Sequence, residues 1–140
     1  MAERGVHAVG GIFFRCEDPE ATREWYRRHL GVQSDEYGSA FTWRRDSAPD
    51  QRGFLQWSPF GEDTDYFGSP DQQFMVNYRV DDLDGLLETL RADGVQIAGE
   101  IEEMEFGRFV HIVDNDGRRL ELWEPIDAAY DDGVTARTES

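Results

Sequence analysis

Two segments of this chain carry the same signals in the same order, about half a chain apart. Asp18 and Pro19 begin a predicted helix that ends at Gly31, and Asp82 begins another that ends at Gly94. Asp is a preferred N-cap, Pro suits the first helical position, and Gly commonly follows the last turn. The aspartates are 64 residues apart and the glycines 63, in a chain of 140. This offset predicts a duplicated unit of one strand, one helix and about three strands.

Each predicted helix carries an apolar stripe. In the second helix, four leucines recur at helical spacing: Leu83, Leu86, Leu87 and Leu90. In the first helix, the stripe consists of Ala21, Trp25 and Leu30, with Tyr26 at its edge. Because a surface helix packs one face against the core, we expect both stripes to be buried against a sheet.

The rest of the chain shows strand signals separated by turn residues. Alternating apolar and polar residues predict strands at 9–15, 37–45, 53–57 and 74–80, another beginning at 95–97, and a hairpin at 106–125. A run rich in Pro, Gly and Asp at 59–72 predicts a linker. We therefore expect an α+β fold in one domain at 6–126, with modules at about 6–58 and 73–126. A polar tail follows at 127–140.

The predicted hairpin brings two polar residues together. Its sequence, FGRFVHIVDNDGRRLELWEP, contains an Asn-Asp-Gly turn at 115–117, and the glycine suits a three-residue loop with a bulge. Counting outward from this loop places His111 opposite Glu121, with Phe109 and Trp123 on the same face. A two-residue loop would shift the register by one residue and separate them.

The charge and composition exclude several classes of partner. With 14 basic and 30 acidic residues, the net charge is −16, which argues against nucleic acid and anionic membranes. The charge favours a cationic ligand, or serves solubility alone. The single cysteine, Cys16, excludes an internal disulfide. The sequence shows neither an apolar run of about 20 residues nor a signal peptide, so we expect a cytoplasmic protein.

Three motifs resemble those of a known family. They are CEDPEATREWYRRHLGV at 16–32, VDDLDGLLETLRADGV at 80–95 and GRFVHIVDNDGRRLELWEP at 107–125. Together they resemble the vicinal oxygen chelate superfamily, which includes glyoxalases, bleomycin-resistance proteins and extradiol dioxygenases. The resemblance implies two tandem βαβββ modules that form an open, cup-shaped mixed sheet, with the helices outside and the site on the concave side. It also implies a homodimer.

The resemblance allows the family's metal site to be checked position by position. Metal-binding members carry a His about seven residues before each capping Asp, and a Glu in the last strand of each module. The corresponding residues here are Gly11, Met75, the pair Leu55 and Gln56, and Glu121. Only Glu121 is a good ligand for a divalent cation. We therefore expect no metal and no other cofactor.

The candidate catalytic residues are Glu121 and His111. A buried carboxylate needs a partner, and His111 is the natural one. The pair is then either structural or a general acid–base couple.

The candidate ligand-binding residues are Phe41, Trp43, Trp57, Asn77, Phe109 and Trp123. Aromatic residues on strands either line a binding site or pack beneath helices. Arg15 and Arg79 each lie near the end of the first strand of their module. We expect them to pair with the protein's own carboxylates rather than to bind an anionic ligand.

These observations favour a metal-independent, glyoxalase- or bleomycin-resistance-like protein. It would hold a flat or cationic small molecule in an acidic, aromatic-lined cup. The alternative is a lyase, isomerase or dioxygenase that uses Glu121, with or without a divalent metal. A third possibility is a cup filled by the protein's own side chains, with an interaction role only. The sequence leaves open whether the protein is an enzyme.

Overall fold

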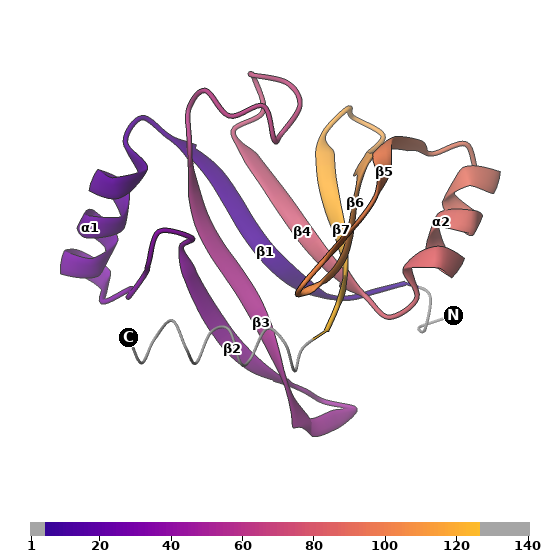
Figure 1. Cartoon of the computed structure of the whole chain (residues 1–140), viewed down its shortest axis with the longest axis horizontal. Coiled ribbons are helices and arrows are strands. Elements are labelled where there is room, and N and C mark those ends of the chain that lie inside the picture. Colours follow the sequence, from indigo (N-terminus) through magenta and orange to yellow (C-terminus); the bar gives the residue numbers. More distant parts are fainter. Residues whose placement is uncertain (1–4, 127–140) are drawn as a thin grey trace.

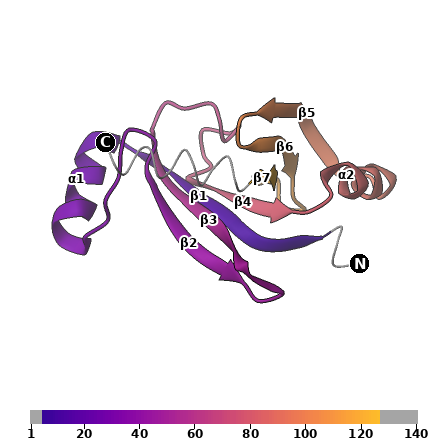
Figure 2. The same ribbon diagram turned by 60° about the horizontal axis from the view of Figure 1, so that its bottom comes forward.

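The computed structural model describes residues 5–126, so the predicted tail at 127–140 lies outside the described residues. The elements follow one another along the chain as β1 (Val6–Cys16), α1 (Pro19–Leu30), β2 (Ser39–Arg45), β3 (Ala48–Gly61), β4 (Phe74–Val80), α2 (Leu83–Ala92), β5 (Gln96–Met104), β6 (Gly107–Val113) and β7 (Arg119–Pro125). The two helices lie at opposite ends of the sheet (Figures 1 and 2). Within residues 5–126, neither helix has the length and apolarity needed to cross a membrane.

The strands form one open, mixed sheet in the order β2-β3-β1-β4-β7-β6-β5. Pairing is parallel between β1 and β3 and between β4 and β7, and antiparallel elsewhere. The antiparallel β1–β4 pair joins the two halves. This arrangement confirms the predicted fold class. The second half has three strands after its helix, whereas two strands follow α1 in the first half.

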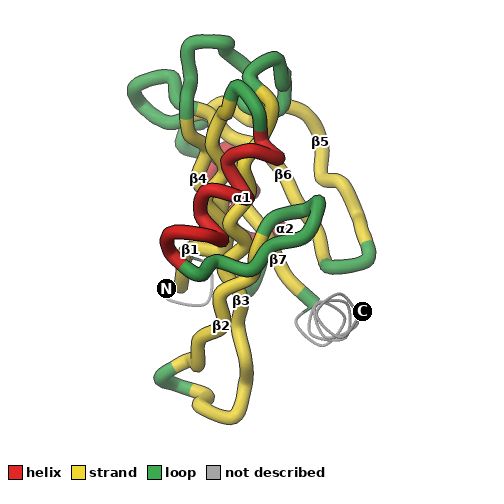
Figure 3. The backbone as a smooth tube through the Cα atoms, turned by 90° about the vertical axis from the view of Figure 1, so that its left-hand side faces the viewer, coloured by secondary structure: helices red, strands yellow, loops and turns green. Residues whose placement is uncertain are grey.

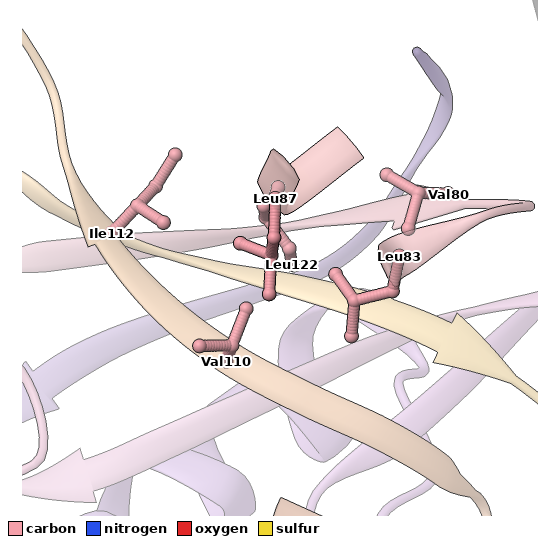
Figure 4. Packing of buried hydrophobic residues seen from close by; sticks show 6 residues of the cluster. All are labelled: Val80, Leu83, Leu87, Val110, Ile112 and Leu122. Carbon is pink, nitrogen blue, oxygen red and sulfur yellow. The ribbon is translucent and has the colours of Figure 1, made fainter. Parts of the chain in front are cut away.

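Helix α2 covers one end of the sheet as predicted. The Asp82 side chain accepts a hydrogen bond from the Gly85 amide and caps the helix. Leu83 and Leu87 are buried against strands β4, β6 and β7. The core there consists of Val80, Leu83, Leu87, Val110, Ile112 and Leu122 (Figure 4). Burial of such side chains is worth about 1.5–3 kcal/mol each, so α2 is held by its apolar stripe.

Helix α1 differs from the prediction. Asp18 caps it and Gly31 ends it with φ 71°, as expected, but none of its residues is buried. Trp25 is 53% exposed and Leu30 62%, so the predicted burial of the stripe is wrong. The physical reason is the direction in which the helix faces. Tyr26 makes ring contacts with Phe14 and Trp57 on the sheet, which turns the adjacent Trp25 toward solvent.

The final hairpin has the predicted register. His111 pairs with Glu121, and Phe109 pairs with Trp123. The Asp114 amide donates to the Arg118 carbonyl, which closes the loop. Gly117 has φ 86°, the left-handed conformation that favours glycine.

Three strands are longer than predicted. Strand β1 covers 6–16 rather than 9–15. Strand β3 covers 48–61 rather than 53–57, because its first part pairs with β2 and its last part with β1. Strand β5 includes the acidic segment at 100–104, which pairs with β6 after a register shift. The linker between the halves therefore begins at residue 62 rather than at 59. The end of the β2–β3 hairpin projects away from the rest of the sheet (Figures 1 and 3).

Candidate functional site

One row of residues crosses four neighbouring strands. Gly11 on β1 is in register with Gln56 on β3 and with Asn77 on β4, and Asn77 is in register with Glu121 on β7. Residues in register on adjacent strands face the same side of a sheet. Gln56, Asn77 and Glu121 all line one cavity, which we call the cup.

The cup has a volume of about 550 Å³ and is lined mainly by aromatic rings. Two stacked ring pairs belong to its wall. Phe60 and Tyr66 lie 5.6 Å apart at an angle of 14°, and Phe109 and Trp123 lie 5.6 Å apart at 8°. The first pair comes from β3 and the linker, and the second from β6 and β7. Both halves of the chain therefore build the cavity.

Glu121 is the most buried charged group of the cup, with 2% of its surface exposed. Its Oε1 accepts a hydrogen bond from Nδ2 of Asn77 at 2.7 Å. Its Oε2 lies 2.9 Å from Nε2 of His111 and accepts a short hydrogen bond from the Tyr66 hydroxyl. An ionised Glu121 only accepts, so His111 satisfies it in the tautomer that carries the proton on Nε2. Three donors thus satisfy the buried carboxylate.

The same contacts change the acidity of Tyr66. Although 36% of the residue's surface is exposed, its hydroxyl is turned inward to Glu121. Burial, followed by the negative charge of Glu121, raises the pKa of Tyr66 above its ordinary value. Tyr66 therefore stays protonated and acts as a donor at physiological pH.

Arg15 holds the linker that carries Tyr66. Its guanidinium donates to the backbone carbonyls of four linker residues at 2.7–3.0 Å: Glu62, Thr64, Ser69 and Gln72. It also lies 5.0 Å from the centre of the Phe67 ring. The expectation that Arg15 pairs with carboxylates is wrong, because the linker's carbonyls converge on its guanidinium.

Arg79 lies between two aromatic rings. It is 2% exposed, and its guanidinium carbon lies 4.9 Å from the centre of the Trp43 ring and 5.1 Å from that of Trp123. A guanidinium stacks well on aromatic faces. Arg79 therefore contacts two rings, and one of them, Trp123, lines the cup.

The structure brings some of the predicted site residues together. Asn77, Phe109, Glu121 and Trp123 line the cup. His111 lies in an adjoining recess of about 90 Å³, whose walls also include Tyr66 and Glu121.

The other three predicted residues lie elsewhere. Trp57 lies between two cup-lining residues on β3, so it faces the opposite side, the outer face, where its ring contacts Phe14 and Tyr26. Phe41 is in register with Leu55 on that same outer face and is 44% exposed. Trp43 contacts the Arg79 guanidinium and is absent from the cup's lining.

Several lining residues were not found from the sequence: Tyr37, Phe13, Phe60, Tyr66, Phe106 and Glu105. Phe13 lies two residues after Gly11, so a closer reading of the alternation would have placed it on the cup face. Tyr66 belongs to a linker without periodicity, and no local pattern places its hydroxyl at Glu121.

The row of residues does not fit the family's metal site. Gly11 offers no side-chain donor, and the Asn77 amide nitrogen is turned toward Glu121. The register places Asn77, not Met75, in line with Glu121, whereas Met75 is buried with Phe13 and Phe67. Within residues 5–126, no group of three or more His, Cys, Asp or Glu side chains could hold a metal ion.

Comparison with known proteins agrees with this architecture. The family model described as glyoxalase/bleomycin resistance protein/dioxygenase superfamily matches residues 6–122. An uncharacterized protein of Bacillus subtilis (strain 168), YetH, is 34% identical over 130 residues, which cover 85% of this chain and 99% of YetH.

Solved structures with the same fold include two methylmalonyl-CoA epimerases. A variant of the Streptomyces coelicolor enzyme has a TM-score of 0.65 at 18% identity and covers 87% of this chain and 96% of its own. The Mycobacterium tuberculosis enzyme has a TM-score of 0.59 at 20% identity, with 90% and 93% covered. At these identities the likeness concerns the fold. The family match, which spans most of the chain, shows that this protein belongs to the glyoxalase/bleomycin resistance protein/dioxygenase superfamily.

Proposed function

We propose that the cup is a metal-independent binding site for a flat, positively charged organic molecule. The observation that carries this proposal is the composition of the lining. Seven of its thirteen residues are aromatic, two are the carboxylates Glu105 and Glu121, and none is Lys, Arg or His. Aromatic faces attract cations by about 0.5–2 kcal/mol each, and an unbalanced carboxylate adds to this attraction.

The size and shape of the cup support a flat ligand. A volume of about 550 Å³ lies within the usual range of small-molecule sites. The Phe109–Trp123 and Phe60–Tyr66 pairs present planar surfaces from the two halves of the chain. A planar ligand can stack on either surface without reorganising the sheet, so little side-chain entropy is lost on binding.

The same lining argues against an acyl-coenzyme A ligand. The solved epimerase variants are complexes with a coenzyme A derivative, and coenzyme A carries several negatively charged phosphates. Glu105 and Glu121 would repel such a molecule, and the cup supplies no basic side chain to offset this repulsion. The ligand of the epimerases is therefore a poor guide to that of this protein.

Metal independence rests on the state of Glu121. Its carboxylate already accepts hydrogen bonds from Asn77, His111 and Tyr66. A cation at this carboxylate would have to displace donors, and the other side chains of the row that line the cup are the neutral amides of Gln56 and Asn77. We therefore propose that Glu121 attracts the cationic ligand through its negative charge and does not bind a metal ion.

Calorimetric titration with two flat molecules of matched size tests this proposal. We expect proflavine, a planar cation, to bind at least tenfold more tightly than 9-anthracenecarboxylate, a planar anion. Glu105→Gln should weaken proflavine binding selectively, because it removes charge and keeps the shape. Equal affinity for the two molecules would contradict the charge argument, and a requirement for added Zn, Ni, Mn or Fe would contradict metal independence.

A second candidate function is acid–base catalysis, which the convergence of Tyr66 and His111 on one carboxylate oxygen favours. Such a group can move a proton to or from a carbon acid bound above it. NMR in D₂O would detect exchange of carbon-bound hydrogen in a panel of 2-hydroxy and 2-oxo acids. Exchange that is lost in Glu121→Gln would establish catalysis, and its absence would leave the binding function alone.

A further inference from the structure

The buried carboxylate of the cup has little room for another hydrogen-bond donor. Asn77 donates to Oε1 of Glu121, and Tyr66 and His111 both lie at hydrogen-bond distance from Oε2. Only 2% of the surface of Glu121 is exposed. A carboxylate accepts hydrogen bonds through its two oxygens, and the protein's own donors already occupy both of them. A ligand that offered an N–H group to Glu121 would therefore have to displace one of these donors.

The other buried polar groups of the cup are also engaged or out of reach. The Ser58 hydroxyl donates to the backbone carbonyl of Tyr37 at 2.7 Å and accepts from Nε2 of Gln56 at 3.1 Å. Oδ1 of Asn77 has no hydrogen-bond partner in the part of the chain that the structure describes. This atom is buried beside Gly10, where even a methyl side chain would collide with it. The cup thus offers a ligand negative charge and aromatic surface, but few accessible hydrogen-bond acceptors.

Aromatic rings surround the carboxylate. The Tyr66 hydroxyl contacts Glu121, and the Tyr66 ring stacks on Phe60 at 5.6 Å. From the second half of the chain, Phe109 lies on the same face of β6 as His111, the strand partner of Glu121. Aromatic enclosures of this kind recognise quaternary ammonium groups, because the ring faces attract the positive charge without any hydrogen bond.

The cost of placing a cation in such a site depends on the substituents of its nitrogen. In water, an N–H cation donates hydrogen bonds to the solvent, and it loses them in the cup unless an acceptor replaces the water. A nitrogen that carries only carbon substituents makes no such bonds, so it loses none on binding. The attraction of the rings and of the carboxylate acts on both kinds of cation. The difference in affinity therefore comes from the unmade hydrogen bond.

We propose that the cup selects flat heteroaromatic cations whose charged nitrogen is alkylated and carries no hydrogen. This inference rests on the proposed function and narrows its class of ligand. The charge of Glu121 attracts the cation, while its hydrogen bonds remain with the protein. Its donors then determine specificity, because by occupying the carboxylate they disfavour ligands that need to hydrogen-bond to it.

Calorimetric titration with a matched pair of dyes tests this inference. Acriflavinium is proflavine with a methyl group on the ring nitrogen, so the two cations differ in whether that nitrogen carries a hydrogen or a methyl group. We expect the wild type to bind acriflavinium about tenfold more tightly than proflavine. The methyl group also adds apolar surface, so the ratio of the two affinities is compared between variants.

Tyr66→Phe isolates the contribution of hydrogen bonding. The substitution keeps the ring but removes one donor from Oε2 of Glu121, so proflavine gains an acceptor. The ratio of affinities should then fall to about threefold or less. Tyr37→Phe is the matched control, because it removes another lining hydroxyl and leaves the donors to Glu121 in place. Its effect should be the same for both dyes, and circular dichroism confirms that each variant is folded.

The possible outcomes separate this inference from the proposed function. If both dyes bind more tightly than 9-anthracenecarboxylate but proflavine binds as tightly as acriflavinium, the proposed function stands and the inference is overturned. If neither dye binds more tightly than this anion, the proposed function fails, and the inference fails with it. An equal ratio in Tyr66→Phe and Tyr37→Phe overturns the selection by the occupied carboxylate.

Discussion

Tyr66 donates its hydroxyl to Glu121, a residue 55 positions later in the chain. The contact joins the linker between the halves to the last strand of the sheet. It converts a segment without secondary structure into one wall of the cup. The linker's position and the state of the buried carboxylate are therefore coupled, and the consequences can be measured.

Tyr66→Phe should change how stability depends on pH. In the folded chain the pKa of Tyr66 is raised above the ordinary value of about 10. The unfolded chain therefore releases the proton first, so the stabilisation is complete below about pH 10 and is lost as pH rises further. Urea unfolding of the wild type should show a steeper loss of stability between about pH 9 and 11 than that of Tyr66→Phe. If the free energy of unfolding depended on pH in the same way in both proteins, this would contradict the raised pKa of Tyr66.

Arg15→Met should loosen the linker. The substitution removes hydrogen bonds to four backbone carbonyls, and we expect a loss of about 2–3 kcal/mol in the free energy of unfolding. Arg44→Met is the control, because among residues 5–126 Arg44 makes only long contacts of 3.4 and 3.5 Å to carbonyls. Its cost should stay below about 0.5 kcal/mol. Chemical denaturation measures both, and equal costs would refute the role of Arg15.

Glu121→Gln should destabilise the protein more than Glu105→Gln. An amide at position 121 directs an NH₂ group toward residues that already donate, Asn77 on one side or His111 and Tyr66 on the other. We expect a cost of about 2–3 kcal/mol, because a buried polar group is left mispaired. Glu105 is exposed, so its cost should be near zero. If thermal unfolding ranked the two variants in the opposite order, this would contradict the description of Glu121 as a carboxylate with all its hydrogen bonds made.

Gly10→Ala should disturb the part of the cup wall formed by Asn77 and Trp123. A Cβ atom at this position would collide with Oδ1 of Asn77 and lie 2.9 Å from the Trp123 ring. Such overpacking costs about 1–3 kcal/mol. Gly61→Ala is the matched control, since its Cβ would meet nothing within 4 Å. Differential scanning calorimetry should show a lowered melting temperature for Gly10→Ala alone, and similar temperatures for both variants would argue against close packing there.

Features that depend on local chemistry could be predicted from the sequence. The caps at Asp18 and Asp82 follow from side-chain hydrogen bonding within one turn. The pairing of His111 with Glu121 follows from the loop length and a glycine in the left-handed conformation. Because strand side chains alternate, a correct register also placed Phe109 and Trp123 on one face.

Features that depend on contacts between distant segments could not be predicted from the sequence. Tyr66 reaches Glu121 because Arg15, on another strand, binds the linker's carbonyls. The exposure of Trp25 depends on how α1 sits on the sheet, which an apolar stripe does not specify. Phe41 and Trp57 carry aromatic rings on strands, yet the face they occupy depends on pairing between β2, β3 and β1.

The row across the sheet has a consequence for protein engineering. Converting it into a four-ligand centre would require changes at Gly11, Gln56 and Asn77, with Glu121 retained. A histidine at position 11 would also collide with the Phe13 ring, whose nearest atoms would be 2.8 and 2.9 Å from its Cβ. Phe13 is buried among Phe67 and Met75, so it cannot simply turn aside. Reinstating metal chemistry therefore demands that the neighbouring hydrophobic packing be redesigned together with the ligands.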